Sequence, residues 1–137
     1  MRVFFQEGIA ASEPYSEALQ KLTPICDCPV FLFVCTGFSI DRGLVDQIFL
    51  GKQKIFGGSH DAMSVLLDAD GGDIAAAYKL IHLLRGVAKK VTIYVPRRAK
   101  SAATFLCLGA DEIVMSEHAE LGPLDVQFLD VATGKQE

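Results

Sequence analysis

Two short apolar runs separated by a helical pattern constrain the fold of this chain most strongly. The first run, at residues 65–67, is closed by acidic residues and a glycine pair, and the second, at residues 91–95, is β-branched and stops at Pro96. Between them apolar residues recur at helical spacing, with Asp73 placed to cap the helix and Gly86 placed to end it. The order strand, helix, strand predicts two parallel neighbouring strands joined by a right-handed crossover.

The same pattern then repeats along the chain. Residues 101–108 are small and apolar, which predicts a helix that Gly109 can end, and residues 112–115 predict the next strand. Open α/β sheets place ligands at the carboxyl ends of their strands. We therefore expect the glycine pair, which follows the first strand, and Ser101, which follows the second, to lie at one edge of the sheet.

The segment upstream of this block predicts a lead-in of similar design. Four elements are expected there, namely strands at residues 2–5 and 30–35 and helices at residues 12–22 and 41–50. Residues 50–63 are glycine-rich, so they predict either a regular lead-in or a mobile flap over the cleft, and His60 reads as a solvated loop residue. A length of 137 residues supports one layered α/β domain over residues 1–137, with mainly parallel strands and flanking helices.

The glycine pair and the serine suggest acyl-transfer chemistry. Freed from a Cβ, the N–H of Gly72 can point into a cleft and stabilise an oxyanion, and the N–H that follows a nucleophile commonly supplies the second donor. This pattern makes Ser101 the candidate nucleophile, Gly72 and Ala102 the candidate oxyanion donors, and Gly71 a candidate substrate contact. On local pattern alone, an N-cap serine and a plain glycine turn explain the residues equally well.

Four spaced motifs carry a resemblance to a known family. They are DADGGD after a strand, VP..AKSAAT around the serine, GADEIVM after it, and LGPLDVQ at the end of the block. In this order they resemble the Clp protease and crotonase superfamily, and most closely the serine dehydrogenase proteinase family, which is related to the signal peptide peptidases. The resemblance implies a Clp/crotonase-like fold and a serine peptidase with Ser101 as nucleophile and Gly72 and Ala102 as its oxyanion hole. It also implies a peptide or protein substrate and a homo-oligomer.

The general base is not identified by the sequence. Clp subunits carry a histidine roughly two dozen residues beyond the serine, but residues 121–125 contain none, and the more closely similar peptidases use a lysine. Lys100 adjoins the serine and is expected to point away from it, His118 lies in a polar turn, and Lys135 lies in a loop-like tail. That tail shows no closing element. We therefore expect either an incomplete C-terminus with a lysine base outside this chain, or a chain without a base.

Two other functions stay open at this point. A crotonase-type acyl-thioester enzyme would use the same oxyanion hole without a serine nucleophile, and a non-catalytic subunit would assemble with a peptidase or regulate it. The three aspartates at Asp68, Asp70 and Asp73 could ligate a metal ion, but turn and cap roles explain them, and the glycines lack phosphate-binding spacing. We expect no cofactor and no metal ion.

Charge and hydropathy restrict the partners. The net charge of −4 and pI near 5.3 provide no basic field for nucleic acid, and Arg97 and Arg98 read as solvated strand ends. The mean hydropathy of +0.31 suggests apolar surface covered by other subunits or by missing chain. Four cysteines suggest reduced thiols, and the longest apolar run is too short for a membrane helix. These observations predict a cytoplasmic protein that reaches a membrane only through segments outside this chain.

Overall fold

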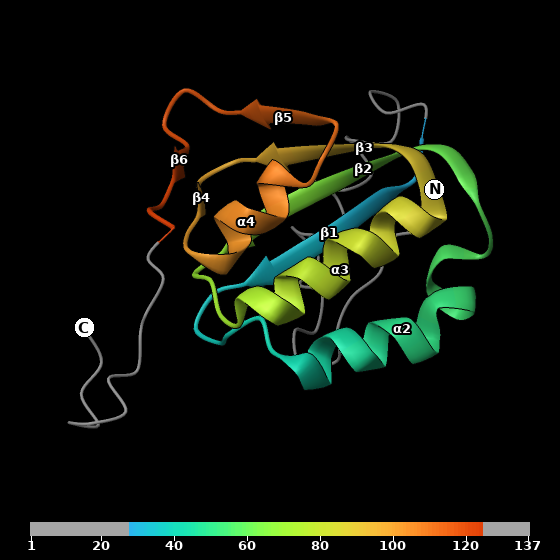
Figure 1. Ribbon diagram of the computed structural model, residues 1–137. Coiled ribbons are helices and arrows are strands. Elements are labelled where there is room, and N and C mark those ends of the chain that lie inside the picture. The colour runs from blue at the N-terminus through green and yellow to red at the C-terminus, as the bar shows by residue number, and fades with distance from the viewer. Residues whose placement is uncertain (1–27, 125–137) are drawn as a thin grey trace, which may run out of the picture.

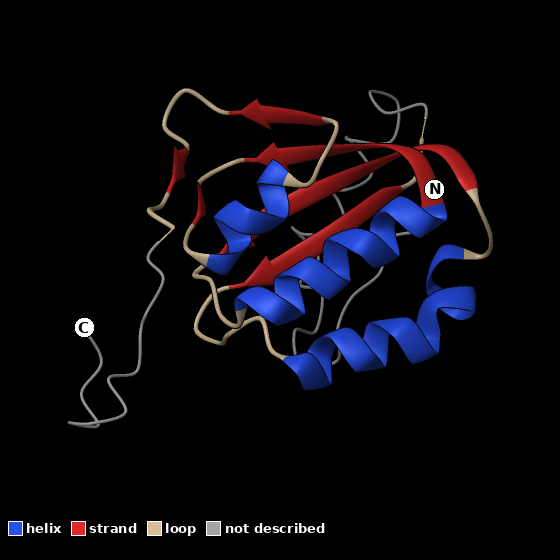
Figure 2. Cartoon of the chain, in the orientation of Figure 1, coloured by secondary structure: helices blue, strands red, loops and turns tan. Residues whose placement is uncertain are grey.

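The computed structural model describes residues 28–124, which form a six-stranded parallel sheet with three helices on one face (Figures 1 and 2). The strand expected at residues 2–5 and the helix expected at residues 12–22 lie outside the described residues. The elements in chain order are β1 (Val30–Cys35), α2 (Arg42–Phe56), β2 (His60–Ala69), α3 (Ile74–Val87), β3 (Ala88–Val95), β4 (Arg98–Ala99), α4 (Ala102–Leu108), β5 (Glu112–Met115) and β6 (Glu120–Leu121).

Strand β2 is the centre of the sheet. It pairs with β1, with β3 and, at its C-terminal end, with β4, while β5 and β6 extend the sheet beyond β3 and β4. Val65 of β2 is in register with Phe31 on β1 and with Ile93 on β3. All three side chains are buried, because the helical layer covers this face of the sheet. The predicted parallel β2–α3–β3 unit is confirmed.

Helix α3 is the central helix of the helical layer and contacts both α2 and α4. Asp73 caps it as predicted, since its carboxylate accepts the backbone N–H groups of Ala75 and Ala76. Those bonds, led by the one from Ala76, hold the pKa of Asp73 below its ordinary value of 3.8. The C-terminal end of helix α4 packs closely on α3. Gly109 lies so near this helix that a Cβ there would stand 2.6 Å from Ile81 Cγ1. The helix over residues 74–87 therefore supports the shorter helix that begins after Ser101.

The glycine-rich stretch before β2 is regular structure, so the flap interpretation is wrong. Helix α2 runs on through Gly51 to Phe56 and ends at Gly57, whose φ of 70° is left-handed and whose N–H donates to Gln53 O at 2.9 Å. His60 begins β2 instead of lying in a solvated loop, and its Nε2 is 2.8 Å from Phe56 O. One glycine did not stop the helix, since beyond it Phe56 is buried in the core and Ile55 packs against that core.

Two strands of two residues each, β4 and β6, were not predicted, and they change which strand Ser101 follows. After Pro96 the chain leaves β3, and Ala99 of β4 pairs with Ala69 at the end of β2, with β6 pairing β4 in turn. Ser101 therefore follows β4 and not β3, which brings it next to the strand that carries the glycine pair. A two-residue strand carries no readable periodicity.

Among the described helices, none combines the length and apolar character that crossing a bilayer requires.

Candidate active site

The glycine turn, residues 70–73, follows the central strand and cannot accept side chains at its two glycines. Gly71 has φ of 109° and Gly72 has φ of 148°, and a Cβ on Gly72 would collide with the backbone of Ile40. The turn is held to Ile40 by two bonds, from Ile40 N–H to Gly71 O and from Asp73 N–H to Ile40 O, each 2.8 Å long. In this parallel bridge the N–H of Gly72 itself points away from Ile40. Across residues 28–124 it has no backbone acceptor.

Ser101 has an unusual backbone conformation. Its φ is 48° and its ψ is −118°, and it is the one non-glycine residue of the described segment with positive φ. It occupies the N-cap position of α4, yet its side chain makes no cap hydrogen bond. Such strain costs about 1–3 kcal/mol and persists only where surrounding structure imposes it. The N-cap role alone therefore does not account for this serine.

The serine segment, residues 96–101, lies in contact with the glycine turn. Lys100 N–H donates to Ala69 O at 3.1 Å, which continues the pairing of β4 with β2. A Cβ on Gly71 would stand 2.8 Å from Lys100 O and 3.0 Å from Ser101 Cβ. The carboxyl ends of β2 and β4 thus bring Gly71 and Ser101 together.

Ala102 follows the serine and is fully buried. The next amide, of Ala103, donates to Lys100 O at 2.9 Å, and Phe105 N–H donates to Ser101 O at 3.1 Å, but within the described residues Ala102 N–H meets no backbone acceptor. The first turn of α4 therefore leaves this N–H group without a backbone acceptor beside Ser101.

The buried side chain of Thr104 hydrogen-bonds the backbone of the serine segment. Thr104 Oγ1 donates to Ala99 O at 2.7 Å, and Gly122 N–H approaches both Ala99 O at 2.8 Å and Thr104 Oγ1 at 3.1 Å. Gly122 also lies against Lys100, whose Cα would stand 2.9 Å from a Cβ at that position. The segment after β6 and the helix after Ser101 thus hold β4 in place. Sequence reasoning did not identify this role of Thr104.

Neither Lys100 nor any histidine of residues 28–124 forms a hydrogen bond with Ser101. Lys100 Nζ forms an ion pair with Glu120 at 2.9 Å, as expected of a charge directed away from the serine. His118 is exposed in its turn, as predicted. The ring of His82 packs against that of Tyr78 with centroids 4.3 Å apart and the ring planes tilted by 60°. Lys135 lies outside the described residues.

The aspartates of the DADGGD motif each contact an arginine, which the sequence did not indicate. Their partners are Arg97 for Asp68, Arg98 for Asp70 and Arg42 for Asp73, at 3.0, 2.6 and 3.3 Å respectively. Asp68 and Asp70 therefore have roles beyond turn formation. Arg97 and Arg98 are likewise paired and not simply solvated. Among the described residues, no group of three or more histidine, cysteine or acidic side chains is arranged to hold a metal ion.

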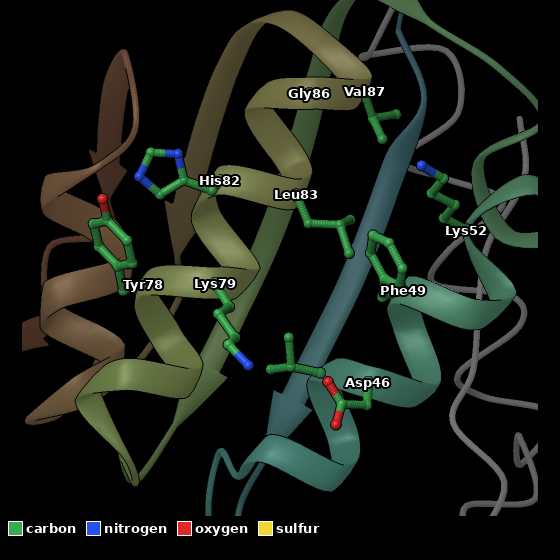
Figure 3. A pocket seen from close by; sticks show the side chains of 10 residues that line it. Asp46, Phe49, Lys52, Tyr78, Lys79, His82, Leu83, Gly86 and Val87 are labelled. Atoms are coloured by element: carbon green, nitrogen blue, oxygen red, sulfur yellow. The ribbon is translucent and has the colours of Figure 1, made fainter.

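A separate cavity of about 550 Å³ lies between α2 and α3 (Figure 3). Phe49 of α2 and Leu83 of α3 point toward each other across it. None of its lining residues belongs to the glycine turn or the serine segment. This cavity is therefore distinct from the candidate active site.

Comparisons with known proteins point to one family and one fold. The family model of the ClpP-like SDH-type serine proteinases matches residues 56–135. Two uncharacterized proteins of Methanocaldococcus jannaschii are 34% and 31% identical to this chain over 66 residues. Those residues are 48% of this chain and 23% of each relative. The matched part of the chain thus spans about a quarter of the length of these relatives.

Solved structures give the same result for the fold. Two mutants of 1510-N, a membrane-bound stomatin-specific protease, match with TM-scores of 0.56 and 0.52 at 23% identity. One carries a serine-to-alanine change, and the other carries a lysine-to-alanine change and is in complex with a substrate peptide. The matches cover 81% of this chain and 55% and 52% of those chains. The Clp-like α/β fold expected from the sequence is confirmed.

Proposed function

The chain belongs to the ClpP-like SDH-type serine proteinase family, and from this premise we propose that it is a serine peptidase with Ser101 as its nucleophile. The observation that carries the proposal is the backbone of Ser101, with φ of 48° and no cap bond from its side chain. Nucleophilic serines at sharp turns between strand and helix are held in strained conformations of this kind, which expose the hydroxyl.

The proposed reaction uses the two backbone N–H groups, of Gly72 and Ala102, that have no backbone acceptor among the described residues. Ser101 Oγ attacks the carbonyl carbon of a peptide bond while a base takes the hydroxyl proton. The carbonyl oxygen becomes an oxyanion that accepts hydrogen bonds from Gly72 N–H and Ala102 N–H. The C–N bond then breaks as the base returns the proton to the leaving amine. Water hydrolyses the resulting ester on Ser101 with the help of the same base.

We propose that this base is a lysine from outside the described residues. A lysine acts as a base only in its neutral form, which burial in an apolar site favours. In the described residues no histidine or lysine side chain bonds to Ser101. The two 1510-N mutants, in which a serine and a lysine are each replaced by alanine, support a serine–lysine pair.

Two alternatives differ in their support. The crotonase-type reaction gains none from a family match to proteinases. A non-catalytic subunit is the second candidate, because the base is not among the described residues. We further propose that peptide segments are the substrate, in line with the family match. We also propose that copies of the chain associate, since Leu50 on α2 is 84% exposed and Tyr78 on α3 is 53% exposed.

An activated ester tests the nucleophile with little demand on the base. Mixing the protein with p-nitrophenyl acetate is expected to release a burst of about one equivalent of nitrophenol as Ser101 is acylated. Ser101→Ala is expected to lose the burst. Ser116→Ala is the matched control, because Ser116 is an exposed serine whose hydroxyl donates to Pro96 O. A burst that survives in Ser101→Ala, or that is absent from the folded wild type, would contradict the proposal.

A further inference from the structure

We propose that Asp70 and Arg98 form a positioning pair that fixes the glycine turn against the serine segment, an inference that rests on the proposed function. The pair joins Arg98 Nη2 to Asp70 Oδ1 at 2.6 Å. Asp70 directly precedes Gly71, and Arg98 lies three residues before Ser101. Of the ion pairs in residues 28–124, this is the one that links the two segments.

Asp70 also ties the turn to the end of β1. Its second carboxylate oxygen accepts Gly37 N–H at 3.1 Å, and its own N–H donates to Cys35 O at 3.2 Å. One side chain therefore contacts the segment after β1 and the serine segment, while its backbone begins the glycine turn. Charge-assisted hydrogen bonds of this kind are directional as well as strong, so they restrict the relative positions of the segments that they join.

Arg98 is surrounded by acidic groups. The register of Ala69 with Ala99 makes Asp68 its neighbour on the adjacent strand, while Asp70 binds its Nη2. Arg98 Nε and Asp68 Oδ1 are both buried, and neither has a hydrogen-bond partner in the described part of the chain. The side chains of Arg98 and Asp70 are 35% and 41% exposed, so the pair is partly shielded from solvent.

The expected effect is local. An ion pair between side chains that are 35% and 41% exposed contributes little to global stability, so its loss is expected to loosen the turn without unfolding the domain. The reaction is sensitive to such loosening, since a displacement of about 1 Å at a reacting group can lower a rate by about a hundredfold. Asp70 and Arg98 would thus act through Gly72 and Ser101 and would not touch the substrate themselves.

Hydrogen exchange across the pair tests this directly. Arg98→Gln is read at Asp73 N–H, which bonds Ile40 O, and Asp70→Asn is read at Lys100 N–H, which bonds Ala69 O. Each reporter lies on the segment opposite the mutation. We expect exchange there to accelerate by about threefold to fivefold, and Arg98→Lys, which keeps the charge, to stay within about twofold of wild type. Lys89→Gln is the control, because it removes a 2.7 Å pair with Asp61 at the other end of β2.

The outcomes separate this inference from the proposed function. Unchanged exchange at Asp73 in Arg98→Gln, or equal acceleration in Lys89→Gln, would overturn the positioning role. Fluorophosphonate labelling of Ser101 is expected to slow by about tenfold in Arg98→Gln, to recover in Arg98→Lys and to be unaffected in Lys89→Gln. A wild type that is not labelled would contradict the proposed function, whereas the exchange measurements would still decide the role of the pair.

Discussion

Gly71 lies directly against Ser101, so closely that a Cβ on Gly71 would stand 3.0 Å from the Ser101 Cβ. The two residues are thirty positions apart, and the pairing of β4 with the end of β2 brings them together. A side chain at Gly71 would therefore push on the serine itself, and the glycine has a positional as well as a conformational role.

Gly71→Ala is expected to destabilise the protein by about 1–3 kcal/mol and to abolish the ester burst. The new methyl group meets Lys100 O and Ser101 Cβ in a left-handed conformation. Gly58→Ala is the matched control, because Gly58 has φ of 136° and open space around it. Urea denaturation and the burst assay compare the two. Equal loss of the burst in both variants would contradict the contact argument.

Ser101→Gly is expected to be more stable than Ser101→Ala by about 1 kcal/mol, since glycine adopts φ of 48° without strain. Both variants lose the hydroxyl and are expected to be inactive, so the comparison isolates the backbone term. The free energies of unfolding from urea titrations provide the measurement. A glycine variant no more stable than the alanine variant would mean that Ser101 carries no strain.

Thr104→Val is expected to lower the free energy of unfolding by about 1–2 kcal/mol and to slow labelling of Ser101. Valine keeps the shape of threonine but leaves Ala99 O without its bond from the hydroxyl. Thr104→Ser keeps the hydroxyl and is expected to react at nearly the wild-type rate. If the serine variant were as impaired as the valine variant, the hydroxyl would not be what holds β4.

Asp111→Asn tests the acid dependence of stability. Val91 N–H donates to Asp111 Oδ2 at 2.8 Å, and this bond, with Arg85 as a further contributor, holds the pKa of Asp111 below its ordinary value of 3.8. The ionised form therefore stabilises the fold above that ordinary value, and the contribution is lost as the pH falls through the lowered pKa. The variant should melt below wild type at pH 7, and the two should converge in strong acid. A gap in melting temperature that persists there would contradict this account.

The sequence predicted the parts of the fold that depend on local chemistry. The β2–α3–β3 unit follows from apolar runs that end in turn residues, and Asp73 caps α3 because a carboxylate at that position reaches backbone amides within its own turn. The closeness of Gly71 and Ser101 follows in general from parallel strands ending at one edge of a sheet.

The remaining features depend on where distant segments run. The strands β4 and β6 have two residues each. Strand β4 forms because β2 extends past the end of its pairing with β3, and β6 then pairs with β4. The Asp70–Arg98 pair depends on that pairing, so no spacing in the sequence could indicate it. The length of α2 was missed because a glycine at residue 51 weighs against a helix, whereas burial of Phe56 favours one.

The most direct test of the central proposal is labelling of the purified protein with a fluorophosphonate probe, read by intact mass and by mapping of the modified peptide. The account predicts a single adduct on Ser101 that Ser101→Ala loses and Ser116→Ala keeps. Such a result would require an activated hydroxyl and hence a base that reaches it. A folded wild type that takes up no probe, or an adduct that maps to another residue, would contradict the assignment of Ser101 as nucleophile.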